Sequence, residues 1–275
     1  MVTDRGTDKS YLAYQYADAE KLRIRQDAHH LYSEFANQRF LEWVVAELDA
    51  GPGALVLDAG CGNGPYHQLI CARGARLAAF DYSLGMARVV KAQATPHPTA
   101  RSTVVFQADA QAIPLRAGIC DRVLAAHILY HMPDQRRALE DMRRVLREGG
   151  RLVLVTGGGR SSRLRELHDE VARELGYTPT TSPAARFTLD HVPLVRSVFP
   201  DATAHLFPNA FLFPTAEAAL SYYASGMVDS VAERDTTSAH RRQFLAFVAE
   251  RVHAEIGGAG VFRDPKDNGC IVATA

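Results

Sequence analysis

The sequence predicts an α/β protein built on a doubly wound, Rossmann-like sheet. Two observations predict this class: between residues 54 and 157 short apolar runs alternate with amphipathic stretches, and the apolar runs show no strict in–out alternation. Continuous short runs are typical of strands buried on both faces, and intervening helices are typical of parallel sheets. The runs expected to form strands are Ala54–Asp58, Arg76–Asp81, Thr103–Gln107, Arg122–His127 and Arg151–Thr156.

Amphipathic patterns place helices before, between and after these strands. Residues 1–50 carry apolar side chains three to four positions apart and should be helical until Gly51-Pro52-Gly53 breaks the pattern. Residues 134–147 give the clearest helix, with one apolar stripe and its arginines elsewhere. Beyond residue 157 we expect a helix and a Thr/Ser/Pro-rich loop within 160–200, a strand within 203–213, a helix over 239–256 and a final strand at Cys270–Ala273.

The composition argues against several classes of protein. Lys+Arg and Asp+Glu are both 31, so the chain lacks the basic excess of nucleic-acid-binding domains. The four cysteines form no Cys-x-x-Cys pair, and scattered thiols fit a reducing cytoplasm. We find no apolar signal-peptide core and no apolar run near the roughly 20 residues that span a membrane. We therefore expect a soluble, cytoplasmic protein with no nucleic-acid or membrane partner. The sequence does not indicate its oligomeric state.

A glycine-rich sequence, Val56–Gly64, lies where the first strand should turn into a helix. Gly60 and Gly62 allow a sharp turn and a close approach of the backbone to a ligand. Asp81 ends the second strand 21 positions after Gly60, where an acid accepts hydrogen bonds from a ribose diol. Asp109 follows the third strand and could accept from an adenine amine, while the next backbone amide faces a ring nitrogen. These strand ends together predict an adenosine site.

The residues around the turn indicate which adenosine compound binds. A dinucleotide fingerprint has glycine or alanine three positions after Gly62, where this chain has Pro65, and no Gly-Lys-Ser/Thr phosphate loop occurs. A nicotinamide oxidoreductase is therefore disfavoured. Asp58 precedes the turn and suits a cationic or amine group, as an adenosyl amino acid would offer.

With these residues in place, together with His127 and Glu148–Leu154, the sequence resembles the class I S-adenosylmethionine-dependent methyltransferases. The resemblance is strong over 54–157 and extends loosely along the chain to bacterial small-molecule methyltransferases of type 11. It implies a seven-stranded sheet in the order 3-2-1-4-5-7-6 with the last strand antiparallel. It also implies an N-terminal helical lid over 1–50 and a methyltransferase domain over 51–275, whose insertion after strand 5, at 158–200, forms the acceptor pocket.

The resemblance also implies roles for individual residues. The glycine turn would line the amino-acid part of S-adenosylmethionine, Asp81 the ribose and Asp109 the adenine, with His127 near the sulfonium. Asp58 and Cys61 remain open as simple turn residues, and Tyr82 as a core residue. The residues expected to bind the cofactor are Asp58, Gly60, Cys61, Gly62, Asp81, Tyr82, Met86, Asp109, Ala110, His127, Arg25 and Tyr16.

The expected reaction is transfer of the methyl group to an oxygen, nitrogen or carbon atom of a small metabolite of bacterial secondary metabolism, leaving S-adenosylhomocysteine. His131 is the first candidate for a base and His29 the second, although packing or shielding of the cofactor is as good an interpretation of His131. No metal is expected, because the acidic cluster of metal-dependent catechol enzymes is missing. The alternative is a relative that binds the cofactor but catalyses a non-methylating reaction such as cyclisation.

Overall fold

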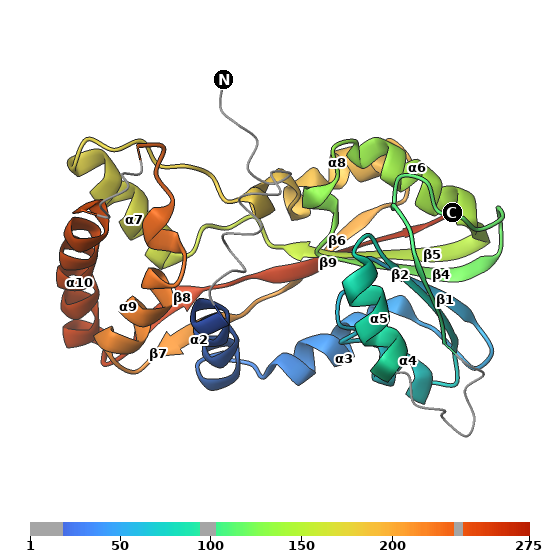
Figure 1. The fold of residues 1–275 in the computed structure, drawn as a ribbon, viewed down its shortest axis with the longest axis horizontal. Coiled ribbons are helices and arrows are strands. Elements are labelled where there is room, and N and C mark those ends of the chain that lie inside the picture. Colours follow the sequence, from blue (N-terminus) through green and yellow to red (C-terminus); the bar gives the residue numbers. More distant parts are fainter. Residues whose placement is uncertain (1–18, 94–102, 234–238) are drawn as a thin grey trace. The chain divides into compact units, whose positions relative to one another are not determined.

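The structure is a computed structural model that describes residues 19–93, 103–233 and 239–275 (Figure 1). The chain divides into two compact units. Unit 1 comprises the described parts of Met1–Asn37, Gly159–Ala185 and Pro208–Asp267; unit 2 comprises those of Gln38–Gly158, Arg186–Phe207 and Asn268–Ala275. This division groups residues 38–50 with the sheet, and the domain boundaries expected from the sequence remain a prediction.

Unit 2 contains a seven-stranded sheet in the order β3-β2-β1-β4-β5-β9-β6. Neighbouring strands from β3 to β5 pair in parallel, and β9 pairs antiparallel with both β5 and β6. The seventh strand of this sheet thus lies between the fifth and sixth, which confirms the expected order 3-2-1-4-5-7-6. The strands are β1 Leu55–Ala59, β2 Arg76–Asp81, β3 Val104–Gln107, β4 Cys120–Ala126, β5 Leu146–Gly157, β6 Thr203–Phe207 and β9 Asn268–Thr274.

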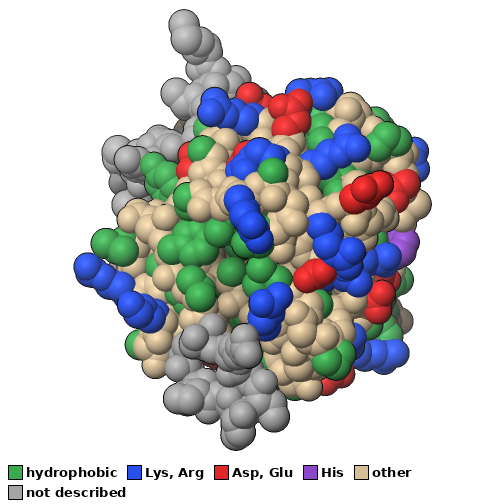
Figure 2. Space-filling view, turned by 90° about the vertical axis from the view of Figure 1, so that its right-hand side faces the viewer, with side chains coloured by type: hydrophobic (Ala, Val, Ile, Leu, Met, Phe, Trp, Pro, Cys, Tyr) green, Lys and Arg blue, Asp and Glu red, His purple; other side chains and the backbone are tan. Residues whose placement is uncertain are grey.

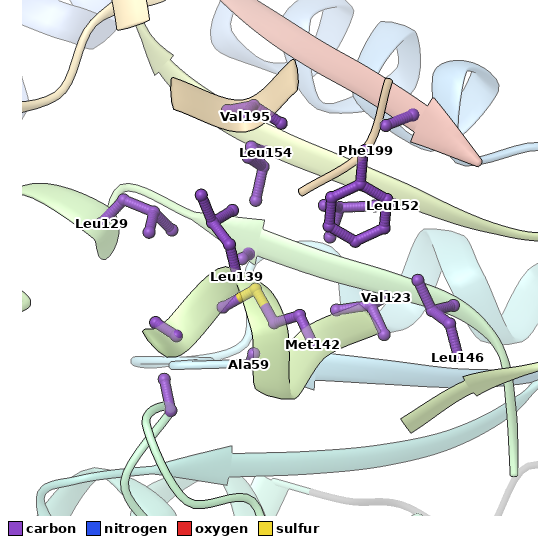
Figure 3. Close-up of a cluster of buried hydrophobic side chains, with 14 of the residues drawn as sticks. Ala59, Val123, Leu129, Leu139, Met142, Leu146, Leu152, Leu154, Val195 and Phe199 are labelled. Atoms are coloured by element: carbon purple, nitrogen blue, oxygen red, sulfur yellow. The ribbon is translucent and has the colours of Figure 1, made fainter. Parts of the chain in front are cut away.

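Helices cover both faces of this sheet because its strands present apolar side chains in both directions. On one face Leu57 and Leu152 pack with α6 and α8; on the other Val56 and Val153 pack with α3 and α4. Figure 3 shows Leu139 and other α6 side chains meeting the strands of the first face. The helices of unit 2 are α3 Asn37–Leu48, α4 His67–Ala72, α5 Leu84–Gln93, α6 Gln135–Val145 and α8 Val192–Arg196, with short turns η1 Leu129–His131 and η3 Leu189–His191.

In the described part of unit 1, four helices pack with a two-stranded antiparallel sheet. Its core is rich in aromatic side chains from β7, α9 and α10, and it also buries His168. Residues Tyr32 and Glu34 exchange backbone hydrogen bonds with β7 at 2.7–2.8 Å, which fixes the end of α2 against this sheet. The elements are α2 Ala19–Leu31, α7 Arg163–Glu174, β7 Ala210–Phe213, α9 Ala216–Ala224, α10 Ala239–Ala259 and β8 Phe262–Pro265, with turns η2 Pro183–Arg186 and η4 Met227–Asp229.

The structure corrects one strand prediction. The expected single strand within 203–213 is two strands, because β6 pairs with β9 whereas β7 pairs with β8. Pro208 interrupts the run and cannot donate a ladder hydrogen bond. The side-chain oxygen of Asn209 then accepts from the backbone N–H groups of Phe35 and Ala210, at 3.1 and 2.9 Å. The predicted helices over 134–147 and 239–256 are present, and no helix in the described ranges is long and apolar enough to cross a membrane.

Candidate functional site

The carboxyl ends of β1, β2, β3 and β4 lie at one edge of the unit 2 sheet, because all four strands run parallel. Ala59 is in register with Phe80 of β2 and with Ala125 of β4, and Asp81 is in register with Gln107 of β3. The structure therefore brings the glycine turn, Asp81, Asp109 and His127 to the same edge. Open α/β sheets bind ligands at such an edge.

The turn after β1 requires glycine at its first position. Gly60 has a φ of +71°, and a Cβ on it would lie 2.5 Å from Cγ2 of Ile128. The backbone N–H groups of Gly60 and Cys61 both donate to the carbonyl of Phe80, at 2.8 and 2.9 Å. Gly62 has a φ of +53° with nothing within 4 Å of its Cβ position, so its surface is open to a ligand.

Asp81 ties the turn to the end of β2. One carboxylate oxygen accepts from the backbone N–H of Gly62 at 2.9 Å, and the other accepts from the N–H of Ser83 at 2.8 Å. A carboxylate oxygen has two lone pairs, so this pair of contacts leaves acceptor capacity for ligand hydroxyls. Asp81, which the sequence predicts to bind a ribose, thus also stabilises the glycine turn.

Asp58 is almost completely buried, with 1% of its surface exposed, and within the described ranges only one of its oxygens has a hydrogen-bond partner. Oδ2 lies 2.8 Å from Nε2 of His67, at the start of α4. Oδ1 is buried without a hydrogen-bond partner among the described residues. Glycine is needed at position 64, since a Cβ there would lie 2.6 Å from Nδ1 of His67. A buried unpaired carboxylate oxygen is costly and points to a donor supplied by a ligand or water.

Cys61 carries a buried thiol within the glycine turn. Its side chain is buried, and burial together with the carboxylates of Asp58 and Asp81 raises the pKa of the thiol to about 12. The neutral thiol therefore predominates at physiological pH, and contact of Cys61 with a cofactor remains a prediction.

The remaining predicted residues at this edge differ in exposure: Ala110 is buried, whereas Tyr82 and Met86 are exposed. Oδ1 of Asp109 accepts from the backbone N–H of Gln111 at 2.8 Å, and Ala110 is buried beside it. Tyr82 and Met86 are 68% and 45% exposed, so neither is a core residue. An exposed aromatic ring next to Asp81 offers a flat surface on which a base can stack.

The segment after β4 carries the two histidines of unit 2 that sequence analysis proposed. His127 has a φ of +57°, an uncommon conformation for a residue other than glycine, and its N–H donates to the carbonyl of Val155 at 2.9 Å. Strained backbone of this kind often marks functional sites. His131 ends the turn η1, with its ring centroid 4.4 Å from that of Tyr130.

Arg25 and His29 belong to α2 and therefore to unit 1, whereas Tyr16 lies outside the described residues. Nδ1 of His29 lies within hydrogen-bond distance of Nζ of Lys266. Sequence reasoning missed Lys266 and also His67. The only local signals were the position of Lys266 just before the last strand and the spacing of nine residues between Asp58 and His67.

Within the described ranges no three His, Cys, Asp or Glu side chains gather in a way that could hold a metal ion. That no metal is required remains a prediction.

Comparison with known families identifies the domain. Residues 57–154 match the family described as a methyltransferase domain. These residues include the glycine turn, Asp81, Asp109 and all of β2–β4. The domain belongs to the class I S-adenosylmethionine-dependent methyltransferases. The antiparallel β9 of the same sheet agrees with the fold expected for this class.

Curated relatives resemble the methyltransferase domain over part of their length. A demethylmenaquinone methyltransferase of Thermobifida fusca is 37% identical over 110 residues, which cover 40% of this chain and 46% of that protein. A tRNA (carboxymethyluridine(34)-5-O)-methyltransferase of Macaca fascicularis is 28% identical over 165 residues, which cover 56% of this chain and 23% of that protein. The chain thus matches less than half the length of either relative.

Solved structures share the fold across most of the chain. The YcgJ protein of Bacillus subtilis superposes with a TM-score of 0.57 at 15% identity, covering 86% of this chain and 98% of that one. The [4+2]-cyclase SpnF superposes with a TM-score of 0.52 at 16% identity, covering 87% of this chain and 81% of that one.

Proposed function

We propose that the protein transfers a methyl group from S-adenosylmethionine to an oxygen, nitrogen or carbon atom of a small metabolite, in bacterial secondary metabolism. The observation that carries this proposal is the buried, unpaired Oδ1 of Asp58 at the turn of a methyltransferase domain. A carboxylate oxygen in that condition suits the ammonium group of an adenosyl amino acid, and it would repel a diphosphate.

The other residues of the edge fit the same cofactor. Gly62 offers a backbone surface with no Cβ contact within 4 Å, and Asp81 keeps free lone pairs for two ribose hydroxyls. Asp109 would accept from the adenine amine, and the exposed ring of Tyr82, with Met86, would cover the adenine. When bound, S-adenosylmethionine supplies an electrophilic methyl group on a sulfonium.

The protein's own part in the reaction is positioning and, for some acceptors, removal of a proton. Holding acceptor and donor in line can contribute as much as about 7–11 kcal/mol. His127, held by its left-handed backbone, would shield the reacting centre, and His131 would accept a proton from a hydroxyl or carbon acid. The lid and the acceptor pocket that the resemblance assigns to residues 1–50 and 158–200 remain predictions.

A small molecule suits this chain better than a nucleic acid. The net charge is zero, and Figure 2 shows basic side chains interspersed with acidic ones on one face, with no continuous basic surface. Phosphate backbones are bound by clustered basic side chains. One relative modifies demethylmenaquinone and another tRNA, so the transfer assay needs both kinds of acceptor.

A second candidate is a reaction without methyl transfer, such as a cyclisation. The structural similarity to a protein described as a [4+2]-cyclase favours keeping this candidate. In that case Asp58, Asp81 and Asp109 would still bind the cofactor, and no label would leave it.

The test combines cofactor binding with a transfer assay. Calorimetry should show binding of S-adenosylmethionine and S-adenosylhomocysteine, and methyl-labelled cofactor should pass its label to low-mass compounds of a bacterial metabolite extract. Transfer to purified tRNA alone would refute the small-molecule acceptor. Cofactor binding with no transfer to either acceptor class would favour the second candidate, and binding of NAD but of neither adenosyl compound would overturn both.

A further inference from the structure

His67 is held against the glycine turn at three points. Its backbone N–H donates to the carbonyl of Gly64 at 3.1 Å, and its Nε2 lies 2.8 Å from Oδ2 of Asp58. Its ring also lies so close to the backbone of Gly64 that a Cβ there would be 2.6 Å from Nδ1 and 2.9 Å from Cε1. The imidazole therefore has little room to turn away from Asp58, although 15% of the side chain is exposed.

The hydrogen bond to Asp58 fixes the tautomer of the neutral imidazole. An ionised carboxylate can only accept, so Nε2 of His67 carries the proton that it donates to Oδ2. Within the described ranges this is the only hydrogen bond of the ring, which leaves the lone pair of Nδ1 without a partner. A proton taken up at Nδ1 would leave the contact with Asp58 in place and add one positive charge to the pair.

Most of the titratable groups around the pair stay neutral. The side chains that interact with Asp58 or with its neighbours are Cys61, Tyr66, Asp81 and Cys270. Burial raises the pKa of both thiols and of the tyrosine, so these three carry no charge at physiological pH. Of this group Asp81 alone is charged, and it accepts from the backbone N–H groups of Gly62 and Ser83. The protonation of His67 therefore decides whether the pair is negative or neutral overall.

The charge of the pair acts on the part of the turn that faces a ligand. Oδ1 of Asp58 has no hydrogen-bond partner among the described residues, and the turn is open at Gly62. A cation that reaches Oδ1, directly or through a water molecule, is attracted by a negative pair and far less by a neutral one. A buried carboxyl that lost its only donor would also tend to take up a proton and lose its charge. The neutral form of His67, with its proton on Nε2, is therefore the form that suits an ammonium group.

We propose that His67 is a positioning residue that acts through Asp58 to select the ammonium group of the cofactor. The proposal rests on the function proposed above, because the ligand is the amino-acid end of an S-adenosyl compound. The Nε2–H of His67 keeps the carboxylate ionised and oriented, with Oδ1 left for the ligand. Protonation of His67 neutralises the pair, so binding of the ammonium group weakens as the pH is lowered.

The test compares two ligands that differ only in the ammonium group, S-adenosylhomocysteine and its desamino analogue, which keeps the carboxylate. In calorimetry at pH 7.5 the wild type should bind S-adenosylhomocysteine at least about tenfold more tightly than the analogue. At pH 5.5 this preference should fall severalfold, because more of His67 is protonated. The ratio of the two affinities cancels the titration of Asp81 and Asp109, which are assigned to the adenosine that both ligands share.

Variants separate the charge of His67 from its hydrogen bond. H67Q keeps an N–H donor but cannot take up a proton, so it should keep the preference at pH 7.5 and hold it at pH 5.5. H67L removes the donor and should lose most of the preference. The matched control is H205L, because His205 also lies beside a carboxylate, with Nδ1 2.9 Å from Oε2 of Glu47, but belongs to β6 at the far edge of the sheet. H205L should follow the wild type at both pH values.

NMR of protein labelled with ¹³C at histidine Cε1 adds a second measurement. There are 11 histidines, and H67Q assigns the signal of His67. At pH 6 the addition of S-adenosylhomocysteine should move that signal toward the neutral form, since a bound ammonium disfavours a second positive charge nearby.

Three results would overturn the proposal: equal affinity of the wild type for the two ligands at pH 7.5, the same pH dependence in the wild type and H67Q, or an unmoved His67 signal. None of them depends on the folding of H67L. If S-adenosylhomocysteine binds but any of these results is found, only the role of His67 fails. If neither adenosyl ligand binds, the proposed function fails with it.

Discussion

Acidification should destabilise unit 1 through one buried histidine. His168 is fully buried: its Nε2 lies 3.2 Å from the carbonyl of Ser230, its Nδ1 lies 2.7 Å from the hydroxyl of Tyr223, and its ring stacks on Phe244 at 4.9 Å. A carbonyl only accepts, so Nε2 donates to it and Nδ1 accepts from the tyrosine. Both nitrogens are satisfied in the neutral ring, and burial lowers the pKa of His168 to about 4.

The size of the effect follows from linkage. The folded pKa lies below the unfolded value of about 6.5, so the unfolded chain binds the proton more tightly and stability is lost as the pH falls between these values. The free energy of unfolding should fall by about 2 kcal/mol between pH 7.5 and pH 5, and by about 3 kcal/mol below pH 4. Asp264 works in the opposite direction, because its pKa is raised to about 6 and protonation favours the folded state.

The assay therefore compares two proteins rather than two pH values alone. Urea unfolding of the wild type and of H168Q, followed by near-ultraviolet circular dichroism at pH 7.5 and pH 5, cancels the contribution of Asp264. H168Q should be less stable at pH 7.5, yet it should lose about 2 kcal/mol less than the wild type on acidification. Parallel pH dependences in the two proteins, or a histidine NMR signal of His168 that titrates near its unperturbed value, would refute the reasoning.

Further expectations concern the methyltransferase domain. D81A should weaken S-adenosylhomocysteine binding by on the order of 1.5–3 kcal/mol in calorimetry, because the carboxylate also holds the N–H of Gly62; unchanged affinity with an intact fold would remove the ribose assignment. G60A should lower the free energy of unfolding by more than the roughly 1–2 kcal/mol of a left-handed alanine, since the new Cβ also meets an isoleucine methyl at 2.5 Å. G62A should lower it only by the backbone strain, because nothing lies within 4 Å of its Cβ position. Equal unfolding midpoints for the two variants would contradict this. H67A should lower stability by about 1–3 kcal/mol by leaving both oxygens of Asp58 unpaired, which the fluorescence of the single tryptophan can report during unfolding. Methyl transfer should survive a chelator, and activity that is lost and then restored by magnesium would show a metal requirement.

The sequence predicted those parts of the fold that depend on local patterns. The glycine turn and Asp81 could be found because backbone conformation and strand ends leave a signature within a few residues. The sheet order followed from resemblance, since apolar runs alone do not say that β9 lies between β5 and β6. The break at Pro208 was visible in the sequence, and it was missed because the apolar run continues on both sides of it.

The contacts between distant side chains could not be predicted. Lys266 and His29 are separated by 237 positions and meet only because residues 32–34 pair with β7. The partnership of Asp58 with His67 depends on the space left by the missing side chain at Gly64. Neither contact produces a periodic pattern or a motif in the sequence, because each depends on how whole helices and strands pack.

The position of β9 has a consequence for how the protein is made. Strands β1 to β5 can pair with one another as they emerge during synthesis, but β6 joins the sheet only through β9. The whole segment Pro208–Asp267 must be synthesised between these two strands. Until then the edge of β5 stays unpaired, and unpaired apolar strand edges invite aggregation or capture by a chaperone. A nascent chain that stalls before Asn268 would therefore expose the unpaired edge of β5, which β9 covers once it has been synthesised.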